Sequence, residues 1–164
     1  MILIVDANVL IDYLRADEQI LVLASRQLGP VRVVRDVVDE VAGLDDDRCA
    51  ALGLIIVEPT TPQIIAAGAS PLNALSFPDK LCLQLAQENH WTCVTNDKAL
   101  RQACTEGAVD IVWGLQMMLL LIKANGLTAN TAIAVAEAIH ASNPTHITAA
   151  ILADFKRKAT GTQK

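Results

Sequence analysis

The sequence lacks any apolar run long enough to cross a membrane. Its most apolar stretch is Leu115–Ile122, with Gln116 inside it, whereas a membrane-spanning helix needs about 20 apolar residues. Met1 leads directly into an apolar segment with no basic region before it, so we expect no signal peptide. These absences predict a cytoplasmic protein without a membrane partner, in which 115–122 is a buried helix.

Cysteine and histidine are too few and too scattered to form a zinc site. The sequence has no C-x-x-C pair, and none of its three histidines has a partner at metal-ligand spacing. We expect free thiols, as in a reducing cytoplasm, at Cys49, Cys82, Cys93 and Cys104. A glycine-rich phosphate loop is also missing, which argues against a nucleotide-binding domain.

Basic charge is in deficit. The chain has 13 Lys and Arg against 18 Asp and Glu, for a net charge of −5. This balance argues against a protein that grips nucleic acid by overall basic charge. It leaves open a nucleic-acid enzyme, because a metal ion can bring positive charge to an acidic site.

Short apolar runs alternate with helical patterns from Met1 to about Asn125. The run Ile2–Val5 is typical of a strand buried on both faces. This alternation predicts an α/β protein of three layers, α/β/α, with a central, mostly parallel sheet of about five strands. The remaining strands are expected at Val31–Val34, Leu54–Val57, Thr92–Thr95 and Val109–Val112.

The helices are expected between and after these strands. One follows Asp6, and the others are expected at Asp17–Leu28, Asp36–Ala42, Pro62–Ala69, Phe77–Asn89, Lys98–Glu106, Trp113–Ala124, Ala129–Ala141 and His146–Lys158. Asp36 is expected to cap its helix. The triplet Asp45–Asp47 is predicted to be a solvated turn, and the polar tail Ala159–Lys164 is predicted to be frayed.

Four acids fall near strand ends or helix starts: Asp6, Glu40, Asp79 and Asp97. Asp6 and Asp97 each follow a predicted parallel strand, so both should lie at the same edge of the sheet, where ligands of α/β proteins bind. Each acid also has a purely structural interpretation. Asp6 and Asp97 fit helix N-caps, Asp79 fits a capping box with Ser76, and Glu40 fits an exposed helix residue.

The order of these motifs resembles the PIN-domain ribonucleases, in particular the VapC-like toxins of bacterial toxin–antitoxin pairs. The resemblance spans about Met1–Leu121 and rests on ILIVDANVLIDYL, VVDEV, LSFPDKLCLQLA and CVTNDKALRQA. It implies a nuclease domain over residues 1–126. Residues 127–164 are then a helical extension packed on this domain or on a dimer mate.

The resemblance also implies roles for individual residues. Asp6, Glu40, Asp79 and Asp97 match the acids that hold Mg²⁺ (or Mn²⁺) and catalyse hydrolysis of RNA, the expected substrate. Asn8, Thr95 and Asn96 match supporting positions, and Lys80, Lys98 and Arg101 are placed to contact RNA phosphates. A small antitoxin protein and a second copy of the chain, forming a homodimer, are the implied protein partners.

Three points stay open at this stage. Asp36 lies one helical turn before Glu40 and is an alternative ligand, although its expected role as a cap favours Glu40. Ala7 stands where many relatives carry Ser or Thr, so a hydroxyl contact is absent there. The alternative function is a non-catalytic PIN-like module that binds nucleic acid or regulates.

Overall fold

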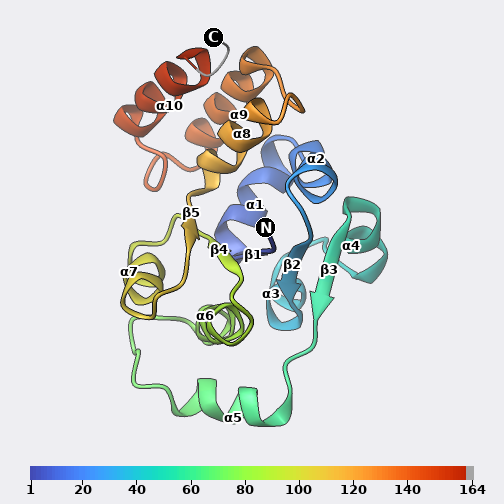
Figure 1. Cartoon of the computed structure of the whole chain (residues 1–164), viewed down its shortest axis with the longest axis vertical. Helices are drawn as coiled ribbons and strands as arrows, with labels where there is room; N and C mark the ends of the chain where they lie inside the picture. The colour runs from blue at the N-terminus through green and yellow to red at the C-terminus, as the bar shows by residue number, and fades with distance from the viewer. Residues whose placement is uncertain (162–164) are drawn as a thin grey trace.

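The computed structural model describes residues 1–161 and consists of a five-stranded sheet surrounded by helices (Figure 1). The strand order is β3-β2-β1-β4-β5, and every neighbouring pair is parallel. The strands are β1 (Leu3–Val5), β2 (Val31–Val34), β3 (Leu54–Val57), β4 (Thr92–Val94) and β5 (Ile111–Val112). The predicted α/β class with a parallel central sheet is confirmed.

The first strand is central because its side chains are apolar on both faces. Leu3, Ile4 and Val5 are each 0% exposed, and Ile4 pairs with Arg32 of β2 on one side and with Cys93 of β4 on the other. A strand with neighbours on both sides and helices on both faces needs such a continuous apolar run.

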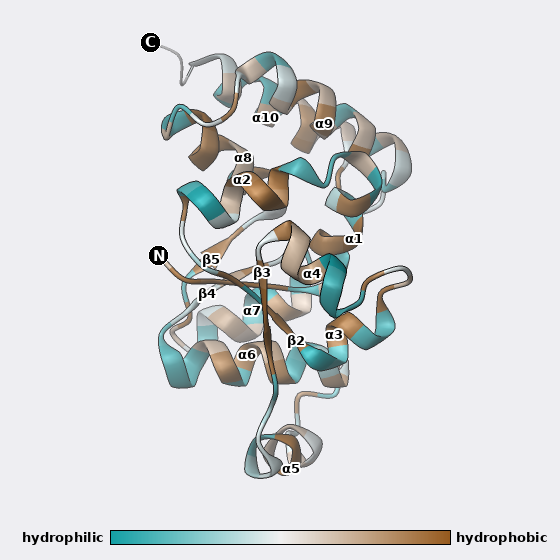
Figure 2. Cartoon of the chain, turned by 90° about the vertical axis from the view of Figure 1, so that its right-hand side faces the viewer, coloured by the Kyte–Doolittle hydropathy of each residue, from teal (hydrophilic) through white to brown (hydrophobic). Residues whose placement is uncertain are grey.

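Helices cover both faces of the sheet. Figure 2 shows α1, α2 and α8 on one side of the strands and α6 and α7 on the other. The helices are α1 (Ala7–Ala16), α2 (Gln19–Gln27), α3 (Arg35–Glu40), α4 (Asp46–Leu52), α5 (Thr61–Ala69), α6 (Phe77–Asn89), α7 (Lys98–Glu106), α8 (Gly114–Lys123), α9 (Ala129–Ser142) and α10 (Ala149–Gly161). None of the helices within residues 1–161 is long and apolar enough to span a bilayer.

Two predictions about aspartates are wrong. Asp45–Asp47 is not a turn, because Asp45 accepts a hydrogen bond from the backbone N–H of Arg48 at 2.8 Å and thereby caps α4. Asp36 is not a cap, because α3 begins one residue earlier with Val34 at the N-cap position. At α4 three consecutive aspartates hid which one precedes the first helical turn, and at α3 the N-cap residue is apolar and makes no side-chain cap hydrogen bond.

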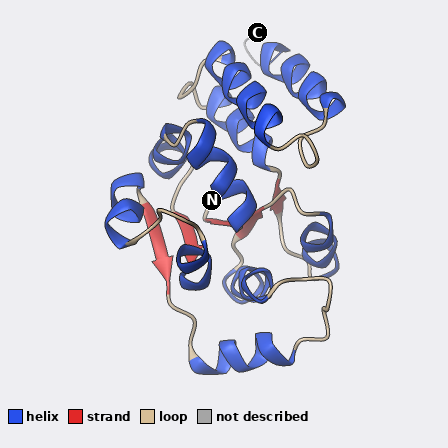
Figure 3. Cartoon of the chain, turned by 180° about the vertical axis from the view of Figure 1, so that it is seen from behind, coloured by secondary structure: helices blue, strands red, loops and turns tan. Residues whose placement is uncertain are grey.

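The C-terminal helices differ from the prediction in their bounds. Helix α10 begins three residues later than expected and continues to Gly161, and Ala159 is 0% exposed. The predicted fraying is therefore wrong for 159–161, while 162–164 lie outside the described residues. Helices α9 and α10 pack against each other and against α8, at one end of the molecule (Figure 3).

Candidate acidic site at the carboxyl edge of the sheet

Asp6 lies where β1 ends and α1 begins, and it is 1% exposed. One carboxylate oxygen accepts the backbone N–H of Val9 at 2.8 Å, which caps α1. The other oxygen accepts the hydroxyl of Thr95, from the end of the neighbouring strand β4. The side chain is thus held from both elements that meet at this edge of the sheet.

Burial raises the pKa of Asp6 from its ordinary value of 3.8 to about 7. The hydrogen bonds from Thr95 and from the Val9 N–H act in the opposite direction, because they stabilise the charged form. The charges of Asp79 and Asp97 raise the pKa further. Three of the four predicted acids therefore lie close enough to interact electrostatically.

Asp97 caps α7 directly after β4. Its side chain accepts the backbone N–H of Leu100 at 2.8 Å, and its own backbone N–H donates to the hydroxyl of Thr95 at 3.0 Å. The same Thr95 hydroxyl therefore links the two acids at the ends of adjacent strands. The prediction that Asp6 and Asp97 share one edge of the sheet follows from the parallel pairing of β1 with β4.

Asp79 lies in the first turn of α6 and closes the predicted capping box. One of its oxygens accepts the backbone N–H of Ser76 at 3.2 Å and the Ser76 hydroxyl at 2.7 Å. The hydroxyl in turn accepts the backbone N–H of Asp79 at 3.2 Å. The structural interpretation of Asp79 is thus realised, while its charge still acts on Asp6.

Glu40 is the last residue of α3 and is exposed. Partial burial raises its pKa, and the charges of Asp79 and Asp36 raise it further. Beneath these acids, burial raises the pKa of the Cys82 thiol, and so do the charges of Asp6, Asp79 and Glu40. Glu40 therefore belongs to the same acidic group, although Asp36 does not have the capping role that first favoured Glu40 over it.

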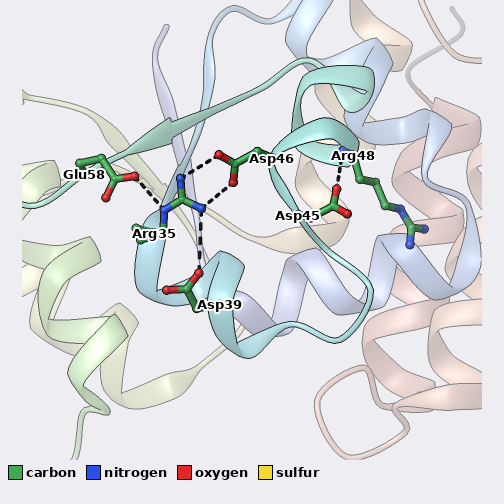
Figure 4. Close-up of polar contacts among 6 residues, drawn as sticks. All are labelled: Arg35, Asp39, Asp45, Asp46, Arg48 and Glu58. Carbon is green, nitrogen blue, oxygen red and sulfur yellow. Dashed lines mark hydrogen bonds and ion pairs between the residues drawn. The ribbon is translucent and has the colours of Figure 1, made fainter.

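An ion-pair network holds α3 in place. The guanidinium of Arg35 lies 2.7 Å from Asp46 at the start of α4 and 2.7 Å from Glu58 just after β3, and it faces Asp39 at 3.9 Å (Figure 4). These contacts join the start of α3 to two neighbouring elements. They help to position the short helix that carries Glu40.

The other predicted site residues differ in the contacts that their side chains make. The exposed side chains of Asn8 and Lys98 make no hydrogen bond within residues 1–161, and Lys80 donates to the carbonyl of Ser70 at 3.1 Å. Asn96 accepts the backbone N–H of Gly114 at 2.9 Å, and Arg101 lies over the ring of Trp113. Thr95, rather than Asn8, makes the contact that supports Asp6.

The four acids fit a divalent cation in chemistry but do not form a closed metal site as they are placed. Carboxylate oxygens are the ligands that Mg²⁺ and Mn²⁺ prefer, and acids that raise each other's pKa are stabilised by a cation. Within 1–161, however, no three His, Cys, Asp or Glu side chains are arranged to hold a metal ion. Asp6 and Asp97 instead use an oxygen to cap a helix, and an oxygen of Asp79 accepts the backbone N–H of the N-cap Ser76.

Two features escaped the sequence analysis. Asp12 on α1 is 5% exposed and accepts the amide of Asn143, at the end of α9, at 3.0 and 3.3 Å. Its position inside the apolar run Val9–Leu14 was the available signal. Trp113 follows β5 at the same edge of the sheet as the acids and is 40% exposed, and its position directly after a predicted strand was the available signal.

Comparison with known proteins supports the fold. No protein-family model matches the chain, and no curated protein matches it significantly. A solved structure of a PilT N-terminus domain protein from the hyperthermophilic archaeon Sulfolobus solfataricus P2 is similar, with a TM-score of 0.53 and 14% identity. The match covers 72% of this chain and 91% of that chain. The likeness confirms the predicted PIN-like fold.

Proposed function

We propose that the chain is a metal-dependent endoribonuclease that hydrolyses RNA phosphodiester bonds. The observation that carries this proposal is the grouping of acids around the buried Asp6, where the Thr95 hydroxyl bonds both Asp6 and the backbone of Asp97 at the ends of adjacent parallel strands and the charge of Asp79 acts on Asp6 and Glu40. They gather at the carboxyl edge of a parallel sheet, where α/β proteins bind their ligands. The PIN-like fold supports the same function.

In this proposal Asp6, Glu40, Asp79 and Asp97 hold the cation. When bound, Mg²⁺ or Mn²⁺ polarises the phosphate and lowers the pKa of the attacking water, so no protein nucleophile is required. Thr95 orients Asp6 through its hydroxyl and fixes the backbone of Asp97. Lys80, Lys98 and Arg101, on the helices that carry Asp79 and Asp97, are proposed to contact the RNA backbone.

The first test removes one charge from the acidic group. We expect Asp6→Asn to lower the rate of RNA cleavage by more than about a hundredfold, because a ligand and its charge are lost. EDTA should abolish wild-type cleavage, and added Mg²⁺ or Mn²⁺ should restore it. Asp110→Asn, an exposed acid before β5 and so at the opposite edge of the sheet, is the control and should retain activity. An Asp6→Asn chain that cleaves at the wild-type rate would refute the assignment.

A second candidate is a PIN-like module that binds nucleic acid or regulates without turnover. It is favoured by the use of Asp6 and Asp97 as helix caps, by the place of Asp79 in a capping box and by the open arrangement of the group within the described residues. RNA that is bound but remains uncut with both Mg²⁺ and Mn²⁺ would identify this function.

We further propose that the chain is the toxin of a toxin–antitoxin pair, acts as a homodimer and is blocked by a small antitoxin whose segment covers the acids. This proposal rests on the resemblance of the motifs around the four acids. Expression of the wild-type chain should then arrest bacterial growth, whereas Asp6→Asn should not. Co-expression of the neighbouring reading frame should relieve the arrest. Equal growth with both chains would contradict the toxin role.

A further inference from the structure

We propose that the cavity between α8 and α10 is a nucleobase pocket, which seats one base of a single-stranded RNA beside the acidic site. The inference rests on the proposed function and names a part of the substrate that the acids do not contact. The cavity has a volume of about 730 Å³, which is within the range of sites for small organic ligands.

The cavity begins next to the acids. Asn96 lines it, and this residue stands between Thr95, which holds Asp6, and Asp97. A nucleotide whose phosphate lies at the acids therefore has this part of the cavity within the reach of its own base or of a neighbouring one. The position links the pocket to the same RNA strand.

Asn96 offers an unused hydrogen-bond donor there. The residue is 8% exposed, its Oδ1 accepts the N–H of Gly114 at 2.9 Å, and its Nδ2 has no partner among the described residues. A Cβ on Gly114 would lie 2.6 Å from that Nδ2, so glycine is needed to leave the amide in place. An amide N–H that no protein group accepts is available to a ligand in the cavity, and a ring nitrogen or carbonyl oxygen of a base would accept from it.

An aromatic ring and a cation lie beside this amide. Trp113 lines the cavity and is 40% exposed, and the guanidinium of Arg101 lies 3.7 Å from the centre of its ring. The Nε of Arg101 is buried and has no hydrogen-bond partner within residues 1–161. Stacking of bases on aromatic rings, with arginine nearby, is a general mode of binding single strands.

The remaining walls are mainly apolar and carry little uncompensated charge. Leu115 and Leu119 of α8 line the cavity together with Ile151 and Phe155 of α10. Asp154 also lines it, but its carboxylate is paired with Lys158 at 2.6 Å and with Arg157. An apolar side chain of a protein would fill such walls equally well, yet it would leave the Asn96 amide unsatisfied. A flat base with polar edges satisfies both.

The test is a binding cycle between the pocket and single bases of the RNA. The RNA probes are labelled hexauridylate and hexaadenylate, together with derivatives of each in which one position carries an abasic ribose. Binding of the protein to each probe is measured by fluorescence anisotropy in a buffer that contains Mg²⁺. The protein is the full chain carrying Asp6→Asn, which avoids cleavage. We expect one abasic position to weaken binding on the order of tenfold. Adding Trp113→Leu, which keeps apolar bulk, should remove this sensitivity, and adding Gly114→Ala should reduce it.

Ile65→Ala removes an exposed apolar side chain, 66% exposed on α5, that does not line the cavity, and is the control that should leave the abasic effect unchanged. The pocket is refuted if no hexamer binds, if all abasic positions weaken binding equally, or if the difference in affinity between abasic positions persists in Trp113→Leu. The last two results would also be expected if the cavity instead receives a protein side chain. Cleavage by the wild-type chain is measured separately, so a failed nuclease assay with an intact abasic effect refutes the proposed function alone.

Discussion

At the residue scale, Asp6 combines a helix cap with a buried charge. Its two oxygens are already hydrogen-bonded, to the Val9 N–H and to the Thr95 hydroxyl, so capping explains why an acid is tolerated there. Capping does not require an environment that raises the pKa to about 7. Acids whose pKa is strongly shifted, at a cost in folding stability, are common at functional sites.

This perturbation predicts how stability depends on pH. Because the pKa of Asp6 rises from 3.8 to about 7 on folding, folding takes up a proton between these values, and stability falls as the pH rises from about 4 to about 7. The penalty is on the order of 4 kcal/mol above pH 7. Asp6→Asn, which preserves a capping oxygen, should therefore raise the melting temperature at pH 8 and change it little at pH 4.

Thermal melts in EDTA at both pH values measure this effect. Added Mg²⁺ should then stabilise the wild-type chain at pH 8 more than the variant, since a ligand of the folded state stabilises it by mass action. A variant that is destabilised equally at both pH values would show that Asp6 is a cap alone.

At the element scale, a polar contact fastens α1 to the end of α9. Asp12 is buried and accepts two hydrogen bonds from the Nδ2 of Asn143, whose Oδ1 lies 3.0 Å from the Nδ1 of His146 and can accept from it. Burial raises the pKa of Asp12. The hydrogen bond from the Asn143 amide lowers this pKa, and so do the charges of His146 and Arg15. The contact lets a carboxylate remain under the C-terminal helices.

We expect Asn143→Ala to lower the free energy of unfolding by about 1–3 kcal/mol at pH 7, because it leaves a buried acceptor without its donor. Without that bond the pKa of Asp12 rises further, so the loss should be smaller at pH 4, where the carboxyl can be protonated. Urea denaturation at the two pH values tests this. Asn130→Ala, an exposed asparagine of the same helix, is the control, and equal losses in the two variants would contradict the role of the contact.

At the scale of the whole molecule, the last two helices, α9 and α10, cover α8. Met118 and Leu121 of α8 are 0% exposed, and α9 and α10 both pack against that helix. We propose that residues 127–164 are an extension of a nuclease domain formed by 1–126, and that its described part, 127–161, completes the core of that domain. The proposed nucleobase pocket then depends on both parts, because α8 and α10 supply its opposite walls.

A chain ending at residue 126 should therefore lose cooperative thermal unfolding, because the apolar face of α8 becomes exposed to water. A pair of point variants makes the same test without truncation. Ala136→Glu, at a position that is 0% exposed, should be strongly destabilising, while Ala138→Glu on the exposed side of α9 should be nearly neutral. A truncated chain with the wild-type melting temperature would show that 1–126 folds independently.

The sequence by itself determined the local elements and the common edge of the acids. The bounds of α6 and α7 were predicted without error, because a capping box opens the first and Asp97 and Gly107 bracket the second. Parallel strands end at one edge, which is why Asp6 and Asp97 could be placed together before their distance was known. The cap of α4 was missed because three consecutive aspartates look alike to local rules.

Only the tertiary structure decided what depends on distant partners. The order of the strands, the burial that raises the pKa of Asp6 and the Asp12–Asn143 contact, which joins residues 131 positions apart, have no local signal. The same holds for the cavity, which is lined by residues of α8 and α10 and by Asn96. Spacing along the chain reports which face of an element is apolar, whereas packing alone determines which faces meet.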